Sequence, residues 1–246
     1  MNSPPTRPSR LFEQRFYAAA WMIIAVLVFW GFSRSYFLRP LFTAKALPSL
    51  LHIHGFLMAS WILLFFIQAR LIAAHRVLLH RRLGIFGAIL AIAVLAAGVC
   101  TSIRAMQLGH VAPGSTPAHG LLVGLLDFLV FAGLVSAALL LRRRADYHKR
   151  LMLLAMFSLA IAGIGRLPYK SFPFSEFWQS GGPLGLFGLE LLIPYAFIGW
   201  DTIRHRRLHP AFAWGIVWFV GVEKLLLEPI AGTPVWQSAA NWILSL

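Results

Sequence analysis

Residues 50–73 read LLHIHGFLMASWILLFFIQARLIA, and this stretch decides the class of fold. It is almost entirely apolar, and about 20 apolar residues are enough for a helix to cross a hydrocarbon core about 30 Å thick. Similar blocks recur on both sides of it, separated by short basic or Pro/Gly-rich segments. The sequence therefore predicts an all-α polytopic membrane helix bundle of about seven transmembrane helices. The expected spans are about 16–33, 50–73, 84–103, 120–141, 150–167, 184–201 and 211–229.

The composition supports the same class. The chain has 246 residues, of which 59% are hydrophobic and 12% charged. Soluble domains average about 45–50% apolar and about 25% charged residues, so an ordinary soluble protein is excluded. No polar stretch is long enough for a separate soluble domain, and residues 1–246 are expected to form a single transmembrane domain. The last segment, 234–246, is too short to span the membrane and is expected to lie at its outer surface.

The distribution of positive charge predicts the orientation of the helices. Of the 22 Lys and Arg residues, 15 fall in the N-terminal segment and in the connections 70–82, 142–150 and 204–207. Because the more basic connections lie in the cytoplasm, we expect a cytoplasmic N-terminus and an outer C-terminus, in a bacterial inner membrane. The formal net charge of +14 then reflects topology and contact with membrane lipids. Anionic head groups at the cytoplasmic face are the expected partners, and no nucleic acid is expected to bind.

The second predicted span carries a polar stripe. His54, Trp61, Gln68 and His75 recur every seven residues, which is nearly two helical turns, so they follow one face of the helix. His52 points to roughly the opposite side. The stripe predicts either a functional surface inside the bundle or interfacial histidines with Trp61 and Gln68 packed between helices, since glutamine often bonds across membrane helices.

Ionisable side chains within other spans predict a polar cavity, because such groups are costly in hydrocarbon and usually face the bundle interior. Asp127 is the deepest acid of the fourth predicted span, and Arg166 lies at the outer end of the fifth. On the sixth, Glu190 shares a face with Asp201, and Pro194 is expected to kink the helix and to expose a backbone acceptor near Glu190. The expected cavity residues are Trp61, Gln68, Asp127, Arg166 and Glu190.

The remaining histidines of the basic connections are expected to be solvated. His80, His205 and His209 lie among arginines in the segments HRRLG and RHRRLHP. Such clusters are typical of positive-inside connections that attract phosphate groups. The pair His209-Pro210 is also expected to start the last transmembrane helix, because proline is favoured in the first turn.

Several fragments resemble a known family. LHIHGFLMASWILLFFIQ, HRRLG, HKRLMLLA, GRLP and HPAFAWG occur in this order and look like a family of uncharacterised bacterial multipass membrane proteins. The resemblance covers roughly residues 30–220 and implies the topology given above. More distantly, histidines at both ends of bundled helices resemble the layout of cytochrome b561-like di-haem proteins.

That layout implies two haem b sites. A b-type haem takes two imidazoles from facing helices at one depth. His54 with His119 would form an outer pair, and His75 with His148 an inner pair. The spacing departs from the resemblance, because His54 and His75 lie about 31 Å apart at 1.5 Å per residue, nearly six turns where a b561-like core has about four.

Three functions follow from these patterns. The first is a membrane redox protein that binds haem b and exchanges electrons with a redox partner. The second is a cofactor-free transporter, sensor or assembly factor that uses the polar cavity. The third is a metal-dependent enzyme acting on an apolar substrate, with His52, His54 and His119 as ligands, although the short histidine boxes of membrane di-iron hydroxylases are absent. No P-loop or GxSxG motif supports ATP-driven transport or serine hydrolase chemistry.

Overall fold

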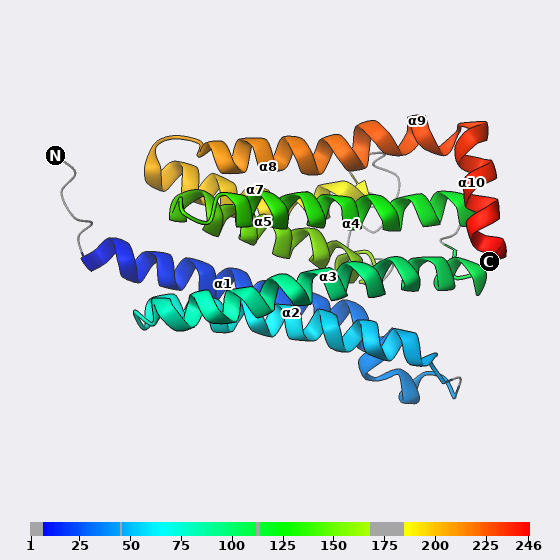
Figure 1. Cartoon of the computed structure of the whole chain (residues 1–246), viewed down its shortest axis with the longest axis horizontal. Coiled ribbons are helices and arrows are strands. Elements are labelled where there is room, and N and C mark those ends of the chain that lie inside the picture. The colour runs from blue at the N-terminus through cyan, green and yellow to red at the C-terminus, as the bar shows by residue number, and fades with distance from the viewer. Residues whose placement is uncertain (1–6, 45, 112–113, 168–184) are drawn as a thin grey trace. The chain divides into compact units, whose positions relative to one another are not determined.

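The structure, a computed structural model, describes residues 7–44, 46–111, 114–167 and 185–246, and every regular element in these ranges is helical (Figure 1). Two π-helical segments, Ser33–Phe37 and Gly221–Leu226, and one 3-10 turn, Arg39–Leu41, interrupt or follow the α-helices. The α-helices are α1 Arg7–Phe32, α2 Ser49–Ala73, α3 Val77–Gln107, α4 Pro117–Leu140, α5 Ala145–Ile164, α7 Gly185–His205, α8 Pro210–Val220, α9 Leu227–Ala231 and α10 Pro234–Ser245.

Five helical segments of the described chain are long and apolar enough to cross a membrane. They are Glu13–Phe37 and the helices α2, α3, α4 and α5. Because helices are the only regular elements of the described residues, the predicted all-α class is confirmed, and the five segments indicate a membrane protein.

The helices extend beyond several predicted span boundaries. α3 begins at Val77, where the sequence predicted a span from residue 84, and α5 begins at Ala145 instead of 150. The physical reason is that a helix continues past the hydrocarbon, so the basic residues that end an apolar block still lie on helical turns. In α3, the segment HRRLG is part of the helix itself, and the turn before it is confined to the few residues after Ala73.

His75 ends helix α2 in a left-handed conformation. Its φ is 59°, and the Arg76 N–H donates to the Leu71 carbonyl at 2.8 Å. This is the helix-ending arrangement that usually takes glycine, because a Cβ is unfavourable there. Helix termination is therefore a sufficient reason for the backbone conformation at His75.

We expect His75→Gly to stabilise the folded chain by up to about 1 kcal/mol, because glycine relieves the positive φ. His75→Ala is the matched control, since it removes the imidazole and keeps the strain. Thermal unfolding in detergent compares the two variants. A lower melting temperature for His75→Gly than for His75→Ala would show that the side chain, and not the backbone, determines stability at this position.

The chain divides into two compact units. The first comprises Met1–Lys45, Met58–Leu90 and Ala160–Ile193. Within it, the Trp21 indole N–H donates to the Ile62 carbonyl at 3.1 Å, and its ring lies 4.4 Å from that of Phe66. α1 also meets the end of α5 at two glycines, because a Cβ on Gly31 would overlap the backbone carbonyl of Gly163. Small residues allow this approach, as is common between membrane helices.

The second unit comprises Ala46–Leu57, Ala91–Leu159 and Pro194–Leu246. α8 runs beside α4, as Figure 1 shows, and the Trp218 indole N–H donates to the Val130 carbonyl at 3.3 Å. Gly133 leaves room for that indole, and Gly215 of α8 fits against Leu154 of α5. These contacts bring α8 against both α4 and α5.

α5 combines the highest burial with the weakest hydrophobicity of the five candidate spans. In its most apolar window 72% of the residues are buried, compared with at most 44% in the other four, yet that window is the least apolar. Buried residues run almost continuously from Arg150 to Ala160. Most side chains in this part of α5 are thus covered by other parts of the chain.

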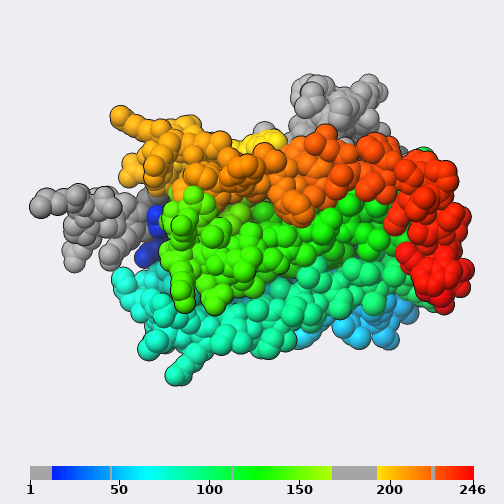
Figure 2. Space-filling view, turned by 45° about the horizontal axis from the view of Figure 1, so that its top comes forward, coloured from blue at the N-terminus to red at the C-terminus, as the bar shows by residue number. Residues whose placement is uncertain are grey.

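α10 forms the C-terminal segment and packs across the beginning of α4, where its red surface adjoins the orange surface of α9 in Figure 2. Thr233 caps the helix, and the Trp236 indole N–H donates to the Ala118 carbonyl at 3.1 Å. Ala240 is fully buried against α4, whereas Trp242 is exposed. The segment expected at the membrane surface is therefore a helix with one face fixed to the bundle.

Candidate functional site

The most deeply buried charges of the described chain form an ion pair in the second unit. Arg150, on the second turn of α5, donates from Nε to Asp201 Oδ2 at 3.0 Å and from Nη2 to Asp201 Oδ1 at 2.8 Å. The side chains are 3% and 10% exposed. Two parallel bonds between a guanidinium and a carboxylate fix both distance and orientation. The pair therefore joins the start of α5 to the end of α7.

Further contacts hold the Arg150 guanidinium in place. Its Nη1 donates to the Asp146 carbonyl oxygen at 3.0 Å, and its central carbon lies 5.7 Å from the centre of the buried Phe212 ring. An arginine over an aromatic face gains a cation–π attraction. The cation thus contacts α5, α7 and α8 at once.

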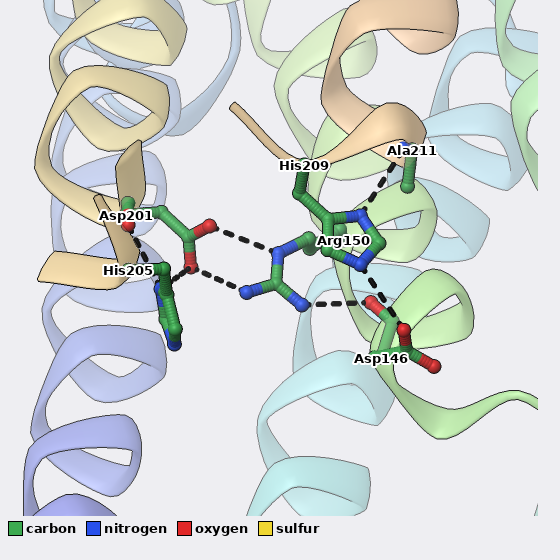
Figure 3. A network of polar contacts seen from close by, with 6 residues as sticks. All are labelled: Asp146, Arg150, Asp201, His205, His209 and Ala211. Carbon is green, nitrogen blue, oxygen red and sulfur yellow. Dashed lines mark hydrogen bonds and ion pairs between the residues drawn. The ribbon is translucent and has the colours of Figure 1, made fainter. Parts of the chain in front are cut away.

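His209 connects α8 to α5. It is the N-cap of α8, where its Nδ1 accepts a hydrogen bond from the Ala211 N–H at 3.1 Å. Its Nε2 lies 3.1 Å from Asp146 Oδ2, and its ring meets that of Tyr147 edge-on at 4.8 Å. Figure 3 shows that the two bonds leave opposite sides of the ring. His209 therefore caps one helix and contacts an acid of another.

These two bonds define the protonation state of His209. An imidazole nitrogen that accepts from an N–H carries no proton, so Nδ1 is bare and Nε2–H donates to Asp146. Burial holds the pKa of His209 below its ordinary value of 6.5, and the Arg150 charge acts in the same direction, against the opposing effect of Asp146. His209 is thus the neutral Nε2–H form at neutral pH.

His205 forms the outer edge of the network. Its Nδ1 donates to the Asp201 carbonyl oxygen at 2.8 Å and lies 3.4 Å from Asp201 Oδ1. The side chain is 40% exposed, whereas Arg150 behind it is buried. The arrangement thus links a solvent-exposed imidazole to a buried carboxylate, and two histidines and two acids meet where three helices end (Figure 3).

Comparisons with protein families, curated proteins and solved structures found no match.

Three of the four residues of the stripe predicted on the second span lie on the less exposed side of α2, whereas His75 follows the helix and is exposed. Trp61 is buried, His54 and Gln68 are half-buried, and His52 is exposed. His54 meets the Phe128 ring edge-on, with ring centres 6.4 Å apart. The Gln68 side-chain carbonyl is buried and has no hydrogen-bond partner among the described residues.

His119 belongs to a second, smaller polar group at the start of α4. Its Nδ1 lies 3.1 Å from the Ser115 hydroxyl, and its Nε2 lies 3.7 Å from Glu228 Oε1. Its backbone N–H donates to the Thr116 hydroxyl, which caps the helix. Both ring nitrogens are thus close to other polar groups, and a metal or haem iron would have to displace one of them.

His148 joins α5 to the end of α4, with Nδ1 2.8 Å from the Ala138 carbonyl oxygen. A bond of this kind satisfies a terminal carbonyl of α4.

The other residues predicted for the polar cavity lie on different helices. Asp127 is half-buried on α4. Arg166 is exposed, donates to the Ala162 carbonyl and lies 4.7 Å from the Phe32 ring centre. Glu190 falls within α7, but its side chain is not among those that the structure describes.

The metal-site residues do not form a cluster in the described part of the chain. No group of three or more His, Cys, Asp or Glu side chains with metal-binding geometry occurs there. His52 and His54 also lie on differently exposed sides of α2.

The sequence pattern missed the network and misplaced one of its members. His209 was expected to be solvated, but it is only 8% exposed, because capping α8 draws the ring beneath the helix start. One signal was present in the sequence. Asp146 precedes Arg150 by four residues, and Asp201 precedes His205 by four, an acid-before-base spacing that favours pairing on a helix. In the structure Asp201 contacts His205, but Arg150 bonds only the backbone carbonyl of Asp146. The side-chain partners of Arg150 and Asp146 come from other helices, which the spacing does not reveal.

Proposed function

We propose that this chain is a proton-responsive membrane protein, of the transporter or sensor class, in which the network around His209 takes up the proton. The supporting observation is that both ring nitrogens of His209 are engaged, Nδ1 by the Ala211 N–H and Nε2 by Asp146. The imidazole therefore cannot gain a second proton without losing a bond that starts α8.

Protonation would change three interactions in the same direction. A proton on Nδ1 points at the Ala211 N–H and removes the cap of α8. A cation at the first turn opposes the helix dipole, which favours negative charge there. The new charge also lies beside Arg150, whose own charge is neutralised by Asp201. Each of these effects destabilises the first turn of α8, whereas the new charge strengthens the contact of His209 with Asp146 of α5. Proton uptake is therefore coupled to the stability of the start of α8.

We expect the folded chain to lose stability as the pH falls below about 6.5. The sign follows from linkage: a lowered pKa means that the unfolded chain binds more protons on this histidine, so acid favours unfolding until His209 is protonated in both states. His209→Asn is the matched variant, because asparagine can cap α8 and does not titrate. Thermal unfolding between pH 8 and 5 should show a steeper acid loss in the original chain than in the variant. Parallel profiles would contradict the assignment of the proton to His209.

Amide exchange and proton flux then test the response itself. After correction for the intrinsic exchange rate, which itself falls with pH, the protection of the Ala211 amide should decrease in the original chain as the pH falls and stay nearly constant in His209→Asn. In vesicles holding a pH-sensitive dye, a transporter should move protons down an imposed gradient and the variant should not; exchange without flux identifies a sensor. An Ala211 exchange profile identical in both chains would overturn the proposal.

The proposed topology has seven crossings, with a cytoplasmic N-terminus, an outer C-terminus and placement in a bacterial inner membrane. α7 has 21 residues, enough for a helix to cross a hydrocarbon core about 30 Å thick. α8, the π-helical segment and α9 follow one another directly from Pro210 to Ala231, a comparable length. The network then lies at the cytoplasmic end. Single cysteines in the connections, in a Cys100→Ser background, should react with an impermeant thiol reagent from the inside near 143 and 206 and from the outside near 110.

A haem b protein is the second candidate, supported by one observation at His148. A histidine that ligates iron usually donates its other ring N–H to a backbone carbonyl or a carboxylate, and His148 Nδ1 lies 2.8 Å from the Ala138 carbonyl. Absorbance of the purified chain, oxidised and reduced, tests this directly. A Soret band lost in His148→Ala supports it, and a colourless folded protein removes it.

A further inference from the structure

We infer that the connections 142–149 and 202–208 together form a binding site for the head group of an anionic phospholipid, such as phosphatidylglycerol. This inference concerns a ligand and does not depend on the proton response proposed above. It rests on the placement of the two connections, on their charge balance and on the apolar side chains among them.

The network places the two connections side by side. Arg150 bonds Asp201 from one, and His209 bonds Asp146 from the other, so the segments flanking these residues meet at one end of the second unit. Figure 3 shows the three helix ends converging on this point. Charges far apart in the sequence therefore act on the same ligand.

The two segments that meet here contain more basic than acidic residues. Residues 142–150 and 201–209 hold eight Lys and Arg but only two acids, Asp146 and Asp201. Both carboxylates are already bonded, to His209 and to Arg150. Six arginines of these segments are exposed, and we call them the basic rim: Arg142, Arg143, Arg144, Arg204, Arg206 and Arg207.

Exposed apolar side chains next to the basic rim in the sequence favour a lipid over a soluble anion. Leu140 and Ile203 are 80% and 77% exposed, and Leu208 is 50% exposed. Leu140 ends α4, Ile203 lies in the last turn of α7, and Leu208 lies in the connection between α7 and α8. Side chains of this kind enter the acyl region while the adjacent cations remain at head-group level. A nucleic acid or an acidic protein would leave these apolar groups in water.

The test measures lipid preference of the full chain. Purified protein is mixed with equal amounts of phosphatidylglycerol and phosphatidylcholine in neutral detergent, and bound lipids are counted by native mass spectrometry. We expect a preference for phosphatidylglycerol that falls about five-fold for each rim arginine replaced, or about a hundred-fold for Arg143→Gln/Arg206→Gln/Arg207→Gln. The triple lysine variant at the same positions should keep most of the preference.

The control removes equal charge elsewhere, with Arg34→Gln/Arg39→Gln/Arg104→Gln, and should change the preference little. Equal binding of both lipids by the original chain, or a preference that survives in the rim variant, would overturn the inference. Inorganic phosphate at millimolar concentration tests whether the site instead binds free phosphate, which is an anion like the lipid head group. If phosphate alone displaces the lipid and stabilises the chain to the same extent, the site is one for free phosphate and the lipid assignment is wrong.

Discussion

Arg150→Met should destabilise the folded chain by about 3–5 kcal/mol, the largest effect expected of any single substitution at the network. The variant leaves the Asp201 carboxylate buried without the guanidinium that now holds both of its oxygens. It also removes the bond to the Asp146 carbonyl and the contact with the Phe212 ring. Unfolding followed by tryptophan fluorescence in detergent measures the change in free energy.

Two further variants separate the charge from the packing. Arg150→Met/Asp201→Leu removes both charges, and it should recover most of the loss, because a buried apolar pair of similar volume is often as stable as an ion pair. The stability of Arg150→Lys should lie between those of the original chain and Arg150→Met, since an ammonium cannot reproduce the two parallel bonds. Arg143→Met, an exposed site beside the network, is the matched control and should change stability by less than about 0.5 kcal/mol. A double variant no more stable than Arg150→Met would show that the guanidinium acts by its shape and not by its charge.

Gly31→Ala should destabilise the first unit by about 1–3 kcal/mol, although a single methyl group is added. The new Cβ would overlap the Gly163 carbonyl, and a backbone atom cannot turn aside as a flexible side chain would. α1 and the end of α5 must therefore separate. Gly163→Ala should cost less, because its nearest neighbour, the Val28 Cα, lies 3.0 Å away.

Gly199→Ala provides the control for this series. Gly199 lies within α7, and no other atom of the described chain is within 4 Å of the added Cβ. Alanine there should stabilise the helix by about 0.5–1 kcal/mol, as expected from helix propensity. Thermal unfolding of the three variants under one condition gives the order. If Gly31→Ala and Gly199→Ala shift the melting temperature equally, the close approach of the two glycines does not contribute to stability.

The fold class could be predicted because length and hydrophobicity are local properties of the sequence. The residues 50–73 became helix α2, Ser49–Ala73, and His209-Pro210 starts α8 as expected. Boundaries such as the start of α3 were less accurate, because a helix continues into basic residues that hydropathy assigns to the connection. The number of crossings and the orientation depend on a membrane as well as on the chain.

The site was harder to predict because its geometry is tertiary. Polar residues in the middle of apolar blocks, such as Gln68 and Asp127, can be selected as candidates because their sequence neighbours are apolar. Arg150 and His209 did not, since each lies among many basic residues in the sequence, and only folding distinguishes the buried arginine from its exposed neighbours. The contacts of Asp146 with His209 and of Asp201 with Arg150 depend on how the ends of α5, α7 and α8 pack against one another.

The contrast between burial and hydrophobicity in α5 bears on how the protein is made. A translocating segment enters the bilayer by itself when it is sufficiently apolar, and each charged residue reduces that tendency. α5 is the least apolar of the five candidate spans and carries Arg150, whose partner Asp201 is synthesised about fifty residues later. We therefore expect α5 to wait beside the insertion machinery, or to enter together with α4, until α7 has been made. During biosynthesis, the interval between these two helices would be the period in which the nascent chain is most exposed to quality-control proteases.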